Sequence, residues 1–422
     1  MRRKPIELAA VATAAVPGLT PTAVSSAPDD AADFDSALLL DSEGKRWRVR
    51  SPRHAEASAR LETEFLVLRA FAPGIRAELP FLMPTVAGSV RLGALSTFVY
   101  SHLAGTTRSV EELTAGPDQL AREIGVALAA IHDLPHALVS NADLPSYTPN
   151  EFRQRRLNEL DQAATTGKIP PSLLRRWEHA LEDVSLWRFN PCVVHGDLHE
   201  DNLLVDGHRV TAVTGWTDLR IGDPADDFAW LVASNEQDFV DTVLSSYTES
   251  RRDAPDKHLL RRAALSAEFA LAQYLVKGIA AGDDAMISEA EGMLETLAGD
   301  IAEHGGQAIS VEPLPPAAAP AGTAPAGQPE DDGGAGHSAA APGSAQGSAA
   351  VDSGIAGVTP LVVQPVTVVP IPAPVLPAVQ VTPIPADEPA PEDGHAGADS
   401  ASDVPSADDT STAAITIIDV KS

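Results

Sequence analysis

The sequence is poor in several residue types that mark particular classes of protein. It has a single cysteine, Cys192, among 422 residues, which excludes an internal disulfide and is typical of a reducing compartment. Basic residues are scarce: 30 Lys and Arg stand against 59 Asp and Glu, and the net charge of −29 argues against nucleic acid as a partner. No run of 18 apolar residues is present. We therefore expect no spanning helix, no membrane partner and a cytoplasmic location.

Aromatic residues are absent from the C-terminal stretch 305–422, which holds 18 of the 35 prolines. Such a composition cannot bury enough apolar surface to order itself, so we predict a disordered tail. Within it, 362–381 favours extended polyproline-type conformation, and 415–418 is a short β-prone patch that could dock on the edge of a partner. The alternatives are a passive tail that aids solubility and a tail that is the working part of a scaffold.

The N-terminal stretch allows two interpretations. Three basic residues at 2–4 precede an Ala- and Val-rich run, as in a secretory signal. However, Pro5 and Glu7 interrupt its start, and the apolar run 8–16 is short. We favour a helix packed on the first folded region over a signal peptide. Residues 29–35 form an acidic connector.

The most informative stretch is 194–202, which reads Val-His-Gly-Asp-Leu-His-Glu-Asp-Asn. Apolar residues on both sides predict two buried strands, so Asp197 and Asn202 lie on one loop, five residues apart. In phosphoryl transfer, such a carboxylate accepts the proton of the attacking hydroxyl, and such a carboxamide ligates the Mg²⁺ of ATP. The Asp-x-x-x-x-Asn spacing is that of the kinase catalytic loop. The alternative is an ordinary turn with a local Asn cap.

The string His-Gly-Asp-Leu-His-x-x-Asn closely resembles the signature of the aminoglycoside and macrolide phosphotransferase family, which are small-molecule kinases. The resemblance covers about residues 5–300. It implies an α+β, two-lobed protein-kinase-like fold followed by a disordered tail. The small β-rich N-lobe would span 1–104, the larger helical C-lobe 105–304, and the tail 305–422.

The resemblance also implies cofactors, partners and roles. ATP and Mg²⁺ would be the cofactors, and a small molecule would provide the hydroxyl acceptor. Asp197 would act as the base and Asn202 as a magnesium ligand, while His195 would support the loop geometry. The substrate stays open among sugars, amino alcohols, macrolides and aminoglycosides.

A phosphate-binding cation is expected in the N-lobe. Strands are predicted over 37–40 and 47–49, and the resemblance places the cation on the second, where Arg50 aligns. A guanidinium is a fixed positive charge with a geometry suited to phosphate. The alternative is that Arg46, Arg48 and Arg50 form a solvated basic face of the strand, and the sequence does not separate the two.

The resemblance places two further nucleotide contacts in the N-lobe. Apolar residues at spacings of three and four predict a helix over 54–69, where Glu64 matches the partner of the strand cation. Glu62 lies close enough to be confused with it, and a solvent-facing acid is the commoner fate of a single Glu. Backbone groups near Tyr100 and His102 would form the hinge that holds adenine.

Other elements follow from apolar periodicity. Helices are predicted over 119–132, 152–160, 172–186, 239–247, 257–279 and 283–303, and strands over 96–102 and 210–216. The segments 80–84 and 86–92 are expected to continue the N-lobe. By resemblance, Asp227 braces the catalytic loop through hydrogen bonds to its backbone.

The chain departs from the family at Gly215, which stands where a magnesium-binding Asp normally precedes an aromatic residue. Three interpretations follow. Asp218 or Asp223 reaches the metal instead; one metal site works through Asn202; or the protein is a catalytically degenerate kinase-fold protein that binds a nucleotide or small molecule without turnover. We favour retained activity, because magnesium needs few protein ligands. The lost contact would still cost about 100-fold in rate.

Overall fold

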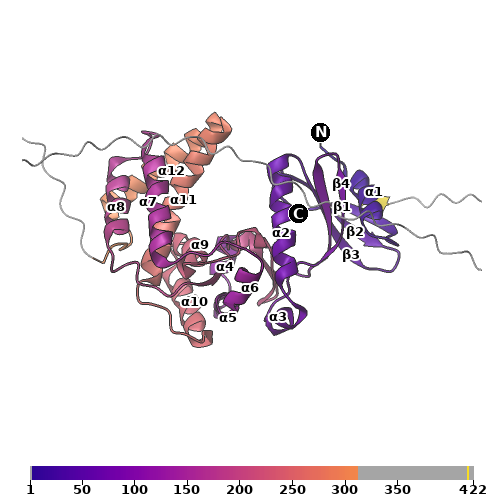
Figure 1. Cartoon of the computed structure of the whole chain (residues 1–422), viewed down its shortest axis with the longest axis horizontal. Helices are drawn as coiled ribbons and strands as arrows, with labels where there is room; N and C mark the ends of the chain where they lie inside the picture. The colour runs from indigo at the N-terminus through magenta and orange to yellow at the C-terminus, as the bar shows by residue number, and fades with distance from the viewer. Residues whose placement is uncertain (1, 312–415, 418–422) are drawn as a thin grey trace, which may run out of the picture. The chain divides into compact units, whose positions relative to one another are not determined.

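A computed structural model describes residues 2–311 and 416–417 (Figure 1). The strands are β1 (Pro21–Ser26), β2 (Phe34–Asp41), β3 (Arg46–Pro52), β4 (Val86–Leu92), β5 (Leu95–Ser101), β6 (Cys192–Val194), β7 (Leu203–Asp206), β8 (Arg209–Val213), β9 (Arg220–Gly222) and β10 (Thr416–Ile417). The helices are α1 (Pro5–Ala15), α2 (Ala55–Ala70), α3 (Pro73–Glu78), α4 (Val110–Thr114), α5 (Asp118–His132), α6 (His136–Asn141), α7 (Pro149–Ala164), α8 (Pro171–Glu182), α9 (Ala229–Ala233), α10 (Gln237–Ser250), α11 (Leu259–Ala281) and α12 (Asp284–His304). Three 3-10 helices are η1 (Glu200–Asn202), η2 (Trp216–Asp218) and η3 (Pro224–Phe228).

The first lobe is built on a six-stranded sheet in the order β10-β1-β2-β3-β5-β4. Its neighbouring strands are antiparallel except at the edge, where β10 runs parallel to β1. The predicted β-prone patch at 415–418 therefore pairs, at Thr416 and Ile417, with an edge of its own chain. The rest of the predicted tail, apart from 305–311, lies outside the described residues.

Two helices cover opposite faces of this sheet (Figure 1). Side chains alternate along β5, so Val99 packs with α1 whereas Phe98 and Tyr100 belong to the cluster that includes α2. Leu8 of α1 is only 1% exposed. The predicted N-terminal helix packed on the first lobe is thus confirmed.

The second lobe is helical and also carries two short antiparallel ribbons, β6 with β9 and β7 with β8. The six predicted helices are present, as α5, α7, α8, α10, α11 and α12. Cys192 is buried at the start of β6 and is a free cysteine. The α+β class with a β-rich first lobe and a helical second lobe is confirmed. The boundaries at 104 and 304 stay predictions.

The segment 80–84 lies against the second lobe as well as following the first. The amide of Leu82 donates to the carbonyl of Thr211 at 2.8 Å, and the amide of Val213 donates back to Leu82 at 3.0 Å. Trp216, just beyond β8, packs against Phe71 at a centroid distance of 5.3 Å. Apolar packing thus continues from α2 to η2. None of the helices in residues 2–311 combines the length and apolar character that a bilayer crossing requires.

Candidate active site

The motif loop leaves β6 through a turn that requires glycine. Gly196 has φ +88°, and a Cβ there would lie 2.3 Å from the backbone oxygen of Asp218. Glycine alone meets both conditions without strain. The chain then presents Asp197, whose side chain is exposed to solvent. The buried strand β6 and the tight turn at Gly196 both precede Asp197, and together they fix the position of its carboxylate.

Asp227 holds the backbone of the loop in place through two hydrogen bonds. Its Oδ2 accepts the amide of His195 and its Oδ1 accepts the amide of Gly196, each at 2.8 Å. The side chain is fully buried. Burial alone would raise the pKa of Asp227, but the hydrogen bond and charge of His132 outweigh it and hold that pKa below its ordinary value. The predicted bracing role of Asp227 is confirmed.

His132, at the end of α5, completes this brace, and its role was not predicted. Its Nε2 lies 3.0 Å from Asp227 Oδ2, and its Nδ1 lies 2.8 Å from the hydroxyl of Tyr247. The tyrosine hydroxyl donates to Nδ1 when Nε2 donates to the carboxylate. The only sequence signal was a histidine at the end of an apolar helix face, which gives no information about its partners.

The side chain of His195 ties the loop to the end of β8. Its Nε2 donates to the carbonyl of Thr214 at 2.9 Å, and its ring packs 4.8 Å from that of Trp216. Burial lowers the pKa of His195, so the neutral ring is favoured. These contacts place His195 in a positioning role, in agreement with the sequence interpretation.

Asn202 folds back onto the same loop. Its Nδ2 donates to the backbone oxygen of Asp197 at 2.6 Å. Its other side faces Gly215, which has φ +79°; a Cβ at Gly215 would lie only 2.3 Å from Asn202 Oδ1. The carboxamide thus occupies the space that a side chain at position 215 would need.

Of the two carboxylates proposed to replace the missing ligand, Asp223 is excluded. It is 1% exposed, and both of its oxygens accept hydrogen bonds from Arg262, at 2.7 and 3.1 Å. It also caps η3 through the amide of Ala225. A carboxylate held by a buried guanidinium and a helix cap cannot turn toward a metal without leaving that cation unpaired.

Asp218 remains available. Its side chain is accessible to solvent, yet the protein around it and the negative charge of Asp197 raise its pKa. The negative charge of Asp197 therefore acts on Asp218, and a cation bound near both carboxylates would relieve their repulsion. Among residues 2–311, no group of three or more His, Cys, Asp or Glu side chains forms a ready metal cluster.

The predicted cation and its helix partner are brought together. Nη1 of Arg50 lies 3.6 Å from Oε2 of Glu64, which is 3% exposed. Glu62 instead accepts a hydrogen bond from Ser96 at 2.6 Å, so Glu64 is the partner. A residue that sequence reasoning missed binds Arg50 more closely: Asp29 accepts from Nε at 2.8 Å and from Nη2 at 2.9 Å.

The expected hinge residues lie at the end of β5. The hydroxyl of Tyr100 donates to Glu64 Oε2 at 3.2 Å, so its side chain supports the ion pair. The amide of His102 donates to the carbonyl of Arg46 at 3.1 Å. That amide is already used within the sheet, so an adenine ring would have to meet a neighbouring backbone group.

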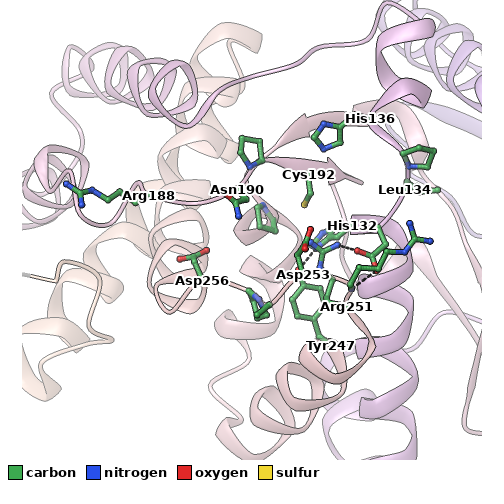
Figure 2. Close-up of a pocket in the computed structure, with 17 residues that line it drawn as sticks. His132, Leu134, His136, Arg188, Asn190, Cys192, Tyr247, Arg251, Asp253 and Asp256 are labelled. Atoms are coloured by element: carbon green, nitrogen blue, oxygen red, sulfur yellow. Dashed lines mark hydrogen bonds and ion pairs between the residues drawn. The ribbon is translucent and has the colours of Figure 1, made fainter.

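A cavity of about 450 Å³ lies behind the brace (Figure 2). His132, Tyr247 and Cys192 line it, whereas Asp197 and Asn202 do not. Figure 2 shows the ring of His132 next to that of Tyr247. The cavity therefore shares a wall with the brace that holds the catalytic loop, and is separate from the carboxylate of Asp197.

A comparison with models of known protein families identifies one family. The model of the phosphotransferase enzyme family matches residues 26–263, more than half of the chain. Uncharacterized protein YcbJ of Bacillus subtilis (strain 168) is 24% identical over 208 residues, covering 46% of this chain. The match spans 65% of YcbJ, less than two thirds of its length.

Solved structures show the same fold. The apoenzyme of macrolide 2'-phosphotransferase MphH from Brachybacterium faecium superposes with a TM-score of 0.59 at 24% identity, covering 68% of this chain and 97% of that one. A macrolide 2'-phosphotransferase type I gives 0.57 at 25% identity, covering 68% and 96%. The GDP and kanamycin complex of an APH(2") enzyme gives 0.58 at 19% identity, covering 70% and 99%.

Proposed function

Because the chain belongs to the phosphotransferase enzyme family, we propose that it transfers the γ-phosphoryl group of ATP to a hydroxyl group of a small molecule. The observation that carries the proposal is the pair of hydrogen bonds that the amides of His195 and Gly196 donate to the carboxylate of Asp227. It fixes the loop that bears Asp197 and Asn202. Both expected chemical groups are thus presented from one rigid support.

Each residue of the site has a distinct task. Asp197 orients the acceptor hydroxyl and takes its proton as the oxygen attacks phosphorus. Arg50, paired with Glu64, contacts the phosphates, and its fork suits their oxygens. His195 keeps the loop attached to the end of β8 through Thr214. The proposed acceptor class follows the structural neighbours, which include a macrolide 2'-phosphotransferase and an enzyme in complex with kanamycin.

The residues present fit a magnesium ion. Asn202 offers a carboxamide oxygen beside Gly215. Asp218 offers an accessible carboxylate, and the negative charge of Asp197 helps to raise its pKa. Magnesium is commonly bound through one or two such groups together with substrate phosphates. When bound, the ion neutralises charge on the phosphates. This protein would hold it through Asn202 and Asp218 without the family's usual carboxylate.

Thermal unfolding with ATP or GTP, with and without Mg²⁺, tests the proposal. A nucleotide that binds the folded state raises Tm by mass action. We expect a magnesium-dependent rise that Asn202→Ala abolishes and that Asp201→Asn, an exposed neighbour, preserves. We expect Asp197→Asn to keep the nucleotide shift but to lose about 100-fold or more in phosphate transfer to a macrolide or aminoglycoside acceptor.

A specific observation supports a second candidate function. Position 215 holds a glycine whose space is filled by Asn202, so the site has no carboxylate there. This favours a kinase-fold protein that binds a nucleotide or small molecule without turnover. A nucleotide shift that ignores Mg²⁺ and Asn202→Ala, with no transfer to any acceptor, would replace the first proposal by this one.

A further inference from the structure

An acidic loop lies against β3 beside Arg50, the residue proposed to bind phosphate. Residues 27–33 connect β1 to β2, and the carboxylate of Asp29 sits between two arginines of β3. Its oxygens accept from Arg50 at 2.8 and 2.9 Å and from Arg48 at 3.2 Å. The Asp29 side chain is only 9% exposed. Of the three arginines that could have formed a solvated basic face, Arg46 is exposed and the Arg48 side chain is 37% exposed, whereas Arg50 is held by Asp29 and only 22% exposed.

The carboxylate occupies the arginines as a phosphate would. A guanidinium binds carboxylate and phosphate oxygens through the same pair of parallel N–H groups. Asp29 uses the Nε and Nη2 edge of Arg50, while Glu64 faces Nη1 at 3.6 Å. Burial disfavours a charged carboxylate, but Arg50 holds the pKa of Asp29 below its ordinary value. Two anions thus offset two cations, and the cluster offers little net attraction to a polyphosphate.

The loop is anchored at points other than Asp29. Arg60 bonds Asp33 at 3.0 Å, and the amide of Arg53 donates to the carbonyl of Asp33 at 2.8 Å. The guanidinium of Arg53 also contacts the carbonyl of Ala31. These contacts hold the C-terminal end of the loop on β3 and α2. Release of Asp29 therefore involves the N-terminal end of the loop. It would also break the hydrogen bond that the Ser36 hydroxyl donates to Asp29 and the one that Arg48 donates to the carbonyl of Pro28 at 2.6 Å.

We propose that Asp29 is a tethered competitor of the nucleotide phosphates, and that nucleotide binds by displacing it from Arg48 and Arg50. This inference rests on the proposed function, which gives Arg50 its phosphate-binding task. Displacement exchanges one anion for another, so it favours ligands that carry several negative charges. Asp29 thereby makes the site selective for triphosphates over nucleosides.

Calorimetric titration of the full chain tests this inference. Asp29→Asn removes the competing charge, and Asp30→Asn is the matched control, because Asp30 is an exposed acid of the same loop whose side chain accepts, within residues 2–311, only the amide of Ala32. We expect Asp29→Asn to lower the Kd for ATP and for inorganic tripolyphosphate about tenfold. Asp30→Asn should leave both values unchanged. Adenosine, which has no phosphate, should respond to neither substitution.

A conservative variant adds a second readout. Asp29→Glu keeps the negative charge on a longer arm, so it should retain a Kd close to that of the wild type. If Asp29→Asn fails to fold, Asp29→Ser, which keeps a hydroxyl for Arg50, replaces it. Unchanged or weaker binding of ATP and tripolyphosphate in these uncharged variants would overturn the inference and assign Asp29 to orienting Arg50.

Failure of the proposed function would look different. In that case the uncharged variants would still bind tripolyphosphate more tightly than the wild type, because that probe needs only the arginines. No variant would transfer phosphate to an acceptor or show a shift that depends on Asn202. The proposed function and the inference about Asp29 are therefore tested by separate measurements.

Discussion

At Gly215 two requirements coincide in one residue. The backbone has φ +79°, and the carboxamide of Asn202 fills the space beside it. Gly215→Ala should cost about 1–2 kcal/mol for the left-handed backbone and about 1–3 kcal/mol more for the displaced Asn202. Denaturant unfolding measures the sum. The variant should also lose the magnesium-dependent nucleotide shift.

Gly207→Ala is the matched control for that substitution. Gly207 has φ +60°, but nothing lies within 4 Å of the Cβ that would be added. It should therefore show the backbone cost alone and keep the nucleotide shift. Equal losses of stability at 207 and 215, with the shift intact in both, would mean that Asn202 is not held by the space at Gly215.

His195 predicts a pH dependence of stability. Burial lowers the pKa of His195 in the folded state. In the unfolded chain that pKa is ~6.5, so the unfolded chain binds the proton more readily. Its contribution is thus fully present above that value and is lost as pH falls toward the folded pKa. Between pH 7.5 and 5.5, the stability gap between wild type and His195→Gln should narrow by about 1 kcal/mol. A gap that stays constant or widens on acidification would contradict this account.

At the scale of the elements, the buried side chain of Arg262 on α11 bonds the cap of η3. The element η3 carries Asp227. Arg262 bonds Asp223 and, at 2.8 Å through two nitrogens, Asp256. Arg262→Met should lower the free energy of unfolding by about 3–5 kcal/mol, because it leaves buried carboxylate charge unpaired. Urea unfolding with phosphate transfer as a second readout would show whether the loop brace weakens too.

An exposed pair provides the comparison for Arg262. Arg155 bonds Glu159 on α7 at 2.9 Å, but the arginine side chain is 54% exposed. Solvent screens such pairs, so Arg155→Met should cost less than about 1 kcal/mol. Similar losses of unfolding free energy in the two variants would mean that burial is not the reason why the ion pairs of Arg262 stabilise the fold.

Helices and strands with a strong apolar period were predictable, and the differences have local causes. α5 begins one residue before its predicted start. α8 ends at Glu182 rather than 186, because Asp183 accepts the amide of Ser185 at 3.0 Å and closes a turn. β8 stops at Val213 because Gly215 is left-handed. β1 was missed, since its residues Pro-Thr-Ala-Val-Ser-Ser show no apolar alternation.

From the residues alone, the site was predictable only where it is local in sequence. The pairing of Arg50 with Glu64 and the Asp227 brace were predicted through the family resemblance. Asp197 and Asn202 lie on one loop, so their spacing alone indicated their chemistry. Asp29 lies 21 residues from Arg50, and His132 lies 95 from Asp227. Such pairs depend on which elements pack together, and a single sequence contains no distances between elements. The contact of Arg262 with Asp223, 39 residues away, was missed for the same reason.

Across the whole chain, the apolar packing that the structure describes lies between Leu8 and Ile309. A protein ending at residue 311 should therefore unfold cooperatively. Loss of β10 removes two residue pairs from the edge of β1, worth less than about 1 kcal/mol, so Tm should fall by less than about 4 °C. Differential scanning calorimetry of the two forms decides this. A larger fall would show that the remaining chain contributes to folding.

Gly215 also constrains the history that the chain can follow. The aspartate usual in the family would bring its Cβ to 2.3 Å from Asn202 Oδ1 on a left-handed backbone. A lineage that restored it would therefore have to turn the Asn202 carboxamide aside and change the backbone at position 215 together. The return is one substitution in the sequence but a coupled rearrangement in the structure, and a descendant that repacks poorly would be lost through its lower stability.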